Sequence, residues 1–371
     1  MNFKLSFLPI LYVLHAGAVK AQPAPTQYTI SQIREMVQND NIKSVDELLP
    51  RLKASFRKNF LLIYRSKSLQ RSSPLFPRAI MYEPDASFIM AFNGNPEDSG
   101  YRSIEMIEFD SELKQFVFGQ IKFDGAGGVD VTLNDKLCKA CHRQESRPNW
   151  ETYPVWDGAY GTVHQGLAKQ IDEETEIANF FAGPGKVGRY QFLINKEARF
   201  KFGVTFSQPN VDFTKKVAHL NFQRIVKKVM ESENYSTYKY AVLGSLVRCD
   251  IETFIPEEIR LKFTYPYSYY LEQSLTIEKE LEEKQLEIAD SSSVFYRPEA
   301  ISSLRFIFEG RGIPMDDWAL TFEKGTYSFS TGRHGILDML PILRKSDPEL
   351  GEAGDDCEVL KKRSLDRFGE R

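Results

Sequence analysis

Between residues 60 and 125 the chain contains five short apolar runs separated by turn residues. The runs read LLIYRS, RAIMYE, SFIMAFNG, SIEMIEFD and KQFVFGQIKFD, with turn segments such as EPDA, NGNPEDSG and DSEL between them. Short runs bounded by Pro, Gly, Asn and Asp are typical of β-strands joined by turns. Parallel strands need a long crossover connection, and no helix-length segment intervenes. We therefore expect an antiparallel β-meander of four to six strands.

Helical patterns occupy the chain on both sides of this region. Before it, SVDELLPRLKASFRKNF predicts one or two short helices, with Ser44 and Glu47 at capping-box spacing. After residue 166 apolar residues recur at helical spacing in DEETEIANFFAG, which Gly183 ends, NVDFTKKVAHLNFQRIVKKVMES, TYKYAVLGSLVRC and the charged YYLEQSLTIEKELEEKQLEIAD. The block from Ile301 to Leu343 predicts two helices around a Gly- and Pro-containing loop. The fold class is α+β, with an N-terminal antiparallel β-meander and a mostly helical C-terminal part.

The first 21 residues have the three-part order of a secretory signal peptide. Lys4 precedes an apolar run from Leu5 to Val19, and small residues stand three before and one before a break after Ala21. The run is shorter than the roughly 20 residues that cross a bilayer, and no other span of membrane length is present. We expect an exported, periplasmic protein with no integral membrane segment in the mature chain.

Composition favours a globular protein without a nucleic-acid partner. Hydrophobic residues make up 42% and aromatic residues 13% of the 371 positions, enough for a substantial core. Lys and Arg number 48 against 51 Asp and Glu, whereas nucleic-acid binding needs a basic surplus. After the signal peptide, we divide the chain into short helices plus the sheet (22–125), a loop carrying the motif described below (126–165) and a mainly helical region (166–371). We expect the helical region to pack with the sheet as one unit.

The four cysteines form two pairs in the sequence. Cys249 and Cys357 are far apart, and thiols outside the cytoplasm tend to be oxidised, so we expect a disulfide that ties the C-terminal tail to the end of a helix. Two unpaired cysteines remain the alternative, because sequence alone does not establish connectivity.

Cys138 and Cys141 belong to a Cys-x-x-Cys-His motif, CKACH, which ends at His142. This is the spacing of c-type haem attachment, in which two thiols form thioethers with the porphyrin vinyl groups and the histidine binds iron. The motif predicts one covalent haem c, held by Cys138 and Cys141, with His142 as the proximal iron ligand. The export signal agrees with this, since bacteria attach haem to such motifs outside the cytoplasm.

Three other interpretations of the cysteine pair stay open. A structural zinc site needs four ligands, and the chain has no second Cys-x-x-Cys, although Cys249 and a distant histidine would complete one. A redox dithiol belongs at a helix start after a strand in a βαβ unit, whereas DGAGGVDVTLNDK before the motif reads as a hinge or turn. A plain structural disulfide within the motif is the third.

The segment from residue 133 to 161 resembles the haem-binding stretch of exported c-type cytochromes. The likeness rests on CKACH followed by RPNWETYPVWDGAYG, and it is similar to that of uncharacterised monohaem cytochrome-c-domain proteins of Gram-negative bacteria. The resemblance implies the same roles for Cys138, Cys141 and His142 but supplies no reaction. The chain departs from small cytochromes c, which are compact helical domains, because a β-meander precedes the motif and a long region follows it.

The second axial ligand of the iron has two candidates. Met315 follows a proline in RGIPMDDW, as in the Met-bearing loop of many cytochromes c, and His164 lies in a Gly-containing loop. An open iron site is the third possibility, and ordinary packing or surface roles are the alternatives for both side chains. Nothing in the sequence singles out His219 or His334 as an iron ligand.

Further residues after the motif suit a haem environment. Arg147 is placed to pair with a propionate, with a solvent-exposed arginine as the alternative. The aromatic residues that would cover the porphyrin, or equally form core, are Trp150, Tyr153, Trp156 and Tyr160.

The sequence thus supports three functions from different classes. The first is electron transfer or redox sensing with an unidentified redox partner protein. The second is a peroxidase-like haem oxidoreductase, which would need an open iron site and a nearby acid or base. The third is a secreted binding protein in which the motif holds zinc or a disulfide. No catalytic residue is identified.

Overall fold

The computed structural model describes residues 27–66, 68–136, 138, 142, 158–160, 172–196, 200, 208–283, 298–311 and 335–369. The predicted signal peptide, residues 1–21, lies outside these ranges.

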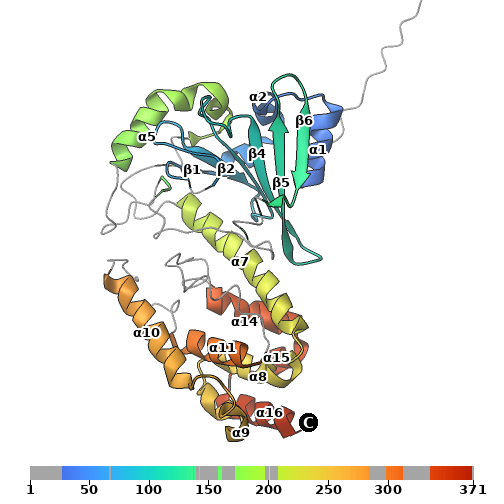
Figure 1. Ribbon diagram of the computed structural model, residues 1–371, viewed down its shortest axis with the longest axis vertical. Coiled ribbons are helices and arrows are strands. Elements are labelled where there is room, and N and C mark those ends of the chain that lie inside the picture. The colour runs from blue at the N-terminus through green and yellow to red at the C-terminus, as the bar shows by residue number, and fades with distance from the viewer. Residues whose placement is uncertain are drawn as a thin grey trace, which may run out of the picture.

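An antiparallel six-stranded sheet forms the N-terminal half, and its strand order follows the chain from β1 to β6 (Figure 1). Each strand pairs with the next, so the predicted meander is confirmed. With the helices of the C-terminal half, the chain has an α+β fold. The strands are β1 (Phe60–Ile63), β2 (Arg78–Tyr82), β3 (Phe88–Phe92), β4 (Ser103–Asp110), β5 (Gln115–Phe123) and β6 (Val129–Leu133).

Strand β6 corrects one expectation from the sequence. The stretch DGAGGVDVTLNDK was expected to be irregular, and this is wrong for Val129–Leu133. The turn is confined to the residues before the strand, where Asp124 Oδ1 accepts the N–H groups of Ala126 (2.7 Å) and Gly128 (2.8 Å). Gly125 and Gly127 have φ values of 82° and 101°, which glycine adopts without strain. The glycines therefore build a tight hairpin turn and leave the following residues free to pair.

Alternate residues of each strand lie on two sheet faces, and both faces are covered. The first, which we call the α1 face, packs against α1 (Ile30–Asn39), α2 (Val45–Leu48), α3 (Ala54–Lys58), α5 (Glu173–Ala182) and the 3₁₀ helices η1 (Leu49–Arg51) and η3 (Gly188–Phe192). The 3₁₀ helix η2 (Pro184–Lys186) packs against α5 and η3. The second, the α7 face, packs against the first half of α7 (Gln208–Glu231). Buried strand residues of the α7 face are Leu61, Ile63, Ile80, Tyr82, Ile89, Ala91, Phe109, Phe116 and Phe118.

The C-terminal half contains a helical layer with its own apolar core. Its elements are α8 (Tyr235–Leu246), η4 (Ile251–Phe254), α9 (Glu257–Arg260), α10 (Tyr267–Glu283), α11 (Pro298–Arg311), α14 (Gly335–Ser346), α15 (Pro348–Glu352) and α16 (Cys357–Gly369). Among the residues described, no helix combines the length and the apolar character needed to cross a bilayer.

Helix α7 joins the two halves (Figure 1). Phe213 and Val217 belong to the core of the α7 face, whereas Phe222 and Val226 belong to the core of the helical half. Polar contacts reinforce the junction, since Lys227 Nζ donates to the carbonyl oxygen of Leu113 at 2.8 Å, in the turn between β4 and β5.

The predicted disulfide between Cys249 and Cys357 is confirmed. It joins the chain just after α8 to the first residue of α16, and the two helices also pack against each other through the edge-on rings of Tyr238 and Phe368, 5.2 Å apart.

Local helix signals from the sequence are confirmed in part. Ser44 Oγ accepts the N–H of Glu47 at 3.1 Å, and Gly183 caps the end of α5. The Glu47 carboxylate accepts from the N–H of Lys43 instead of that of Ser44, so the full capping box is absent there. A complete box, not anticipated, starts α1 with Thr29 and Gln32.

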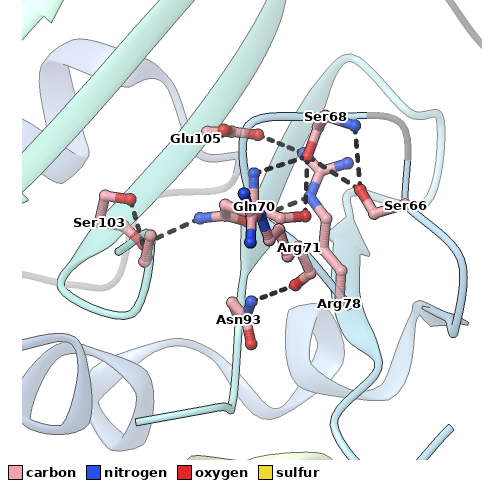
Figure 2. Close-up of polar contacts among 9 residues, drawn as sticks. Ser66, Ser68, Gln70, Arg71, Arg78, Asn93, Ser103 and Glu105 are labelled. Carbon is pink, nitrogen blue, oxygen red and sulfur yellow. Dashed lines mark hydrogen bonds and ion pairs between the residues drawn. The ribbon is translucent and has the colours of Figure 1, made fainter. Parts of the chain in front are cut away.

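A buried polar network fixes the loop between β1 and β2 onto the sheet (Figure 2). Gln70, only 1% exposed, donates from Nε2 to the carbonyl oxygen of Ser103 at 3.1 Å and accepts from Arg78 Nε at 3.0 Å. Arg78 in turn pairs with Glu105 at 2.5 Å. Because each buried group in this chain of contacts has a partner, the loop is held on the sheet without an apolar side chain at its centre.

Candidate functional site

The Cys-x-x-Cys-His motif begins directly after the edge strand β6. Asn134 ends the strand with a φ of 48°, its N–H donates to the carbonyl oxygen of Phe118 at 2.8 Å, and its Oδ1 accepts the Phe118 N–H at 3.1 Å. Lys136, Cys138 and His142 have helical conformation. The segment assigned to a haem-attachment loop, residues 126–165, thus contains a strand and helical residues before and within the motif.

His142 lies against the sheet. Its imidazole centroid is 4.3 Å from the ring centroid of Phe118, and the two planes make an angle of 35°. Phe118 is 2% exposed and shares the α7 face with Phe116. Phe118 was not predicted as a neighbour of the motif. The segment KQFVFGQIKFD did carry a signal, since alternate positions of a strand share a face and Phe116 and Phe118 are two positions apart.

Cys138 points toward the same face of the sheet. It is partly exposed and packs against the apolar cluster that includes Phe118. Cys138 and His142 are four positions apart, the spacing of neighbours on one helix side. Cys141 lies outside the described residues, and the other two predicted haem-binding residues, Cys138 and His142, both pack against the α7 face of the sheet.

Three buried methionines lie on the other side of the sheet from the motif. Met81, Met90 and Met106 pair across neighbouring strands and belong to the core of the α1 face. The sheet itself separates them from His142, so none of them faces it. Met315, the methionine singled out by sequence, and His164 lie outside the described residues.

Of the remaining histidines, only His219 is described. It lies on α7, the helix that covers the motif's side of the sheet, but its side chain is exposed while neighbouring Leu220 is buried. His334 lies outside the described residues.

Of the two roles left open for Tyr160, cover for the porphyrin or part of the core, the structure supports the core. Tyr160 belongs to the core of the α1 face, where its hydroxyl donates to the carbonyl oxygen of Pro74 at 2.9 Å. Burial raises the pKa of the Tyr160 phenol above its usual range, and the carboxylates of Glu176 and Glu173 add to the rise. Arg147, Trp150, Tyr153 and Trp156 lie outside the described residues.

Residues 158–160 close the outer edge of β1. Tyr64 N–H donates to the Gly158 carbonyl oxygen at 2.8 Å, and Tyr160 N–H donates to that of Leu62 at 2.9 Å. His142 lies against β5, whereas residues 158–160 lie at the outer edge of β1, on the far side of the sheet.

The alternative of a zinc site completed by Cys249 is wrong, because the Cys249 sulfur is bonded to that of Cys357 and cannot bind a metal as a thiolate. Within the described ranges, no three His, Cys, Asp or Glu side chains come together as a metal site. The donor set of the motif, two thiols and an imidazole, still fits haem c, and the described part of its surroundings is apolar and aromatic, as a porphyrin face requires.

Comparison with known proteins found no matching family model, no matching curated protein and no matching solved structure.

Proposed function

We propose that this protein is exported to the periplasm and carries one haem c, attached through Cys138 and Cys141, with His142 as the proximal iron ligand. The observation that carries the proposal is the Cys-x-x-Cys-His sequence itself, whose three side chains are the thioether and iron ligands of haem c. Its role is electron transfer or redox sensing with a periplasmic redox partner.

The surroundings of the motif support the proposal. The apolar side chains of Phe109, Phe116 and Phe118 are at least 94% buried on the sheet face toward which Cys138 and His142 point. Such a wall excludes water from one side of the site. Bound haem supplies one-electron chemistry, and an apolar environment around it favours the less charged iron state.

Phe118 would help to position the iron ligand. Its ring contact with His142 restricts the imidazole on one side, and the two hydrogen bonds between Asn134 and the Phe118 backbone fix the strand that carries it. The chain would thus hold the imidazole by packing as well as by its bond to the metal.

Export is supported by two separated features of the chain. The N-terminal 21 residues have signal-peptide order, and the Cys249–Cys357 disulfide is compatible with an oxidising compartment. A disulfide of this kind is rare in the cytosol of most bacteria.

A redox dithiol is the second candidate, and one observation favours it. Only four residues separate the end of strand β6 from Cys138, and Cys138 is helical, so the motif does follow a strand as dithiol motifs do. The sheet is antiparallel throughout, however, and the βαβ unit of thioredoxin-like proteins is absent from the described residues.

Covalent haem decides between the two candidates. The full chain is expressed in a bacterial periplasm with an active cytochrome c maturation system, purified and denatured. We expect a pyridine haemochrome spectrum and a mass increase of one haem, both lost in a Cys138→Ala/Cys141→Ala variant. The control is a known c-type cytochrome matured in the same cells. Haem-free chain beside a fully loaded control would refute the proposal, and thiol titration would then test the dithiol.

With haem attached, carbon monoxide separates carrier from enzyme. An iron with two protein ligands resists carbon monoxide and peroxide, whereas the peroxidase-like alternative needs an open position. We expect no shift of the absorption spectrum with carbon monoxide for an electron carrier. A rapid shift together with peroxide turnover would favour the oxidoreductase.

A further inference from the structure

The two outer strands of the sheet differ in how their edges are treated. Residues 158–160 hydrogen-bond to the outer edge of β1. Strand β6 lies at the other edge, with Val129 36% and Leu133 52% exposed. An open strand edge is a template for pairing with another strand.

The backbone groups that β6 turns outward can be identified from its pairing with β5. Asp124 N–H donates to the Gly128 carbonyl oxygen, and Asn134 N–H donates to the Phe118 carbonyl oxygen. The backbone N–H and C=O groups of the even-numbered residues of β6 therefore point toward β5. Because antiparallel strands alternate, the N–H and C=O groups of Val129, Val131 and Leu133 face away from β5. In the part of the chain that the structure describes, no backbone hydrogen bond links these three residues to a further element.

We propose that β6 pairs with β6 of a second copy of this chain, antiparallel, about a two-fold axis at Val131. A two-fold contact is self-complementary, so one strand must suit its own reversed sequence. In VDVTL this register places Val131 opposite Val131, Val129 opposite Leu133, and Asp130 opposite Thr132 of the second copy. The apolar row continues across the axis and no like charges meet.

Charge and backbone conformation select this register over its neighbours. A shift by one step in one direction places Asp130 directly opposite Asp130, which is destabilising between strands. A shift in the other direction brings in Asn134, whose φ of 48° is outside the strand region. The register centred on Val131 is the one in which all five residues of β6 pair.

The contact joins two six-stranded sheets into one continuous sheet of twelve strands. Five paired residues on each side form a small interface, and small interfaces belong to weak, transient complexes. We therefore expect a dimer that dissociates on dilution.

Two double variants test the pairing and its register. Val129→Lys with Leu133→Lys places Lys opposite Lys at both ends of the contact, whereas Val129→Lys with Leu133→Glu places Lys opposite Glu. Within one chain these positions are roughly 13 Å apart along the strand, too far for a close ion pair. Both variants replace the same two apolar side chains with charged ones, so each controls for the folding effect of the other.

Sedimentation equilibrium of the full exported chain over a dilution series measures the mass. We expect wild type to approach the dimer mass as concentration rises, the Lys/Lys variant to stay monomeric and the Lys/Glu variant to dimerise. Far-UV circular dichroism and thermal midpoints establish that both variants fold. A wild-type chain that is monomeric throughout overturns the proposal, as does a folded Lys/Lys variant that dimerises like wild type. A folded but monomeric Lys/Glu variant overturns the register.

Discussion

The aromatic ring of Phe118 lies 4.3 Å from the imidazole of His142, which places a residue of β5 against the last residue of the Cys-x-x-Cys-His motif. Phe118 is also part of the sheet core, so it links the motif to the stability of the fold. Because the two residues are far apart in the sequence, local spacing does not reveal their contact.

Replacing Phe118 with alanine should destabilise the protein. Truncating a buried Phe costs about 3–5 kcal/mol, through lost burial and the cavity left behind. Urea unfolding followed by circular dichroism measures the loss. Leu113→Ala is the control, because Leu113 is 52% exposed and should change the free energy of unfolding by less than about 0.5 kcal/mol. Equal effects of the two substitutions would contradict the packing described for Phe118.

Removing the Cys249–Cys357 disulfide should lower the free energy of unfolding by about 2–5 kcal/mol, because the unfolded chain gains conformational freedom. The Cys249→Ser/Cys357→Ser variant, compared with wild type by urea unfolding, gives the value. Dithiothreitol should weaken wild type by a similar amount and leave the variant almost unchanged. A reductant effect of the same size in the variant would assign the sensitivity to another cysteine pair.

Glu349 should make the helical half sensitive to acid. The hydrogen bond and charge of Lys239, whose Nζ lies 2.5 Å from Glu349 Oε2, hold the pKa of Glu349 below its usual value. A carboxylate with a lowered pKa stabilises the fold above its unfolded-state pKa, and this contribution disappears as pH falls through the folded-state pKa. Wild type should therefore lose more stability than Glu349→Gln between about pH 6 and about pH 3.

The pH dependence of urea midpoints tests this prediction. Glu352→Gln, a substitution of an exposed glutamate in the same helix α15, should follow the wild-type curve. If Glu349→Gln and wild type give parallel curves, the ion pair does not contribute to acid sensitivity.

Gly94→Ala should be strongly destabilising, because a Cβ at this position would lie 2.2 Å from ring carbons of Tyr190. Tyr190 has little freedom to move, since it is 2% exposed and its hydroxyl donates to the carbonyl oxygen of Pro77 at 2.6 Å. Overpacking of this kind costs about 1–3 kcal/mol or more. The thermal midpoint should fall accordingly.

Gly351→Ala is the matched control for Gly94→Ala. Gly351 lies in helix α15, and a Cβ there would approach other atoms no closer than 3.4 Å. Alanine should be neutral or stabilise the helix by about 0.5–1 kcal/mol. A wild-type midpoint for Gly94→Ala would mean that Tyr190 can move away.

The sequence predicted the elements with strong local signals. Five of the six strands have apolar runs between turn residues, and Gly183 ends α5 where the helical pattern stops. Strand β6 was missed because it is only five residues long and directly follows a Gly-rich turn, and what defines it is its backbone pairing with β5. Tertiary pairing of this kind leaves little trace in local composition.

The candidate site could be predicted by residue type but not by position. Cys138 and His142 were identified from their spacing, whereas the face of the sheet they contact depends on how the chain turns at Asn134. The choice left open for Tyr160, haem cover or core, has a similar origin. Proximity in sequence suggested a place beside the motif, but pairing of residues 158–160 with β1 carries its ring to the α1 face.

Helix α7 has a consequence for the cooperativity of unfolding. Its 24 residues give a rod about 36 Å long, with one end in the sheet core and the other in the helical core. Loss of either core would leave half of this rod without packing, and a solvent-exposed half-helix of about three turns is barely stable in water. Each half of the protein therefore stabilises the other through this helix. We expect a single calorimetric unfolding transition instead of two.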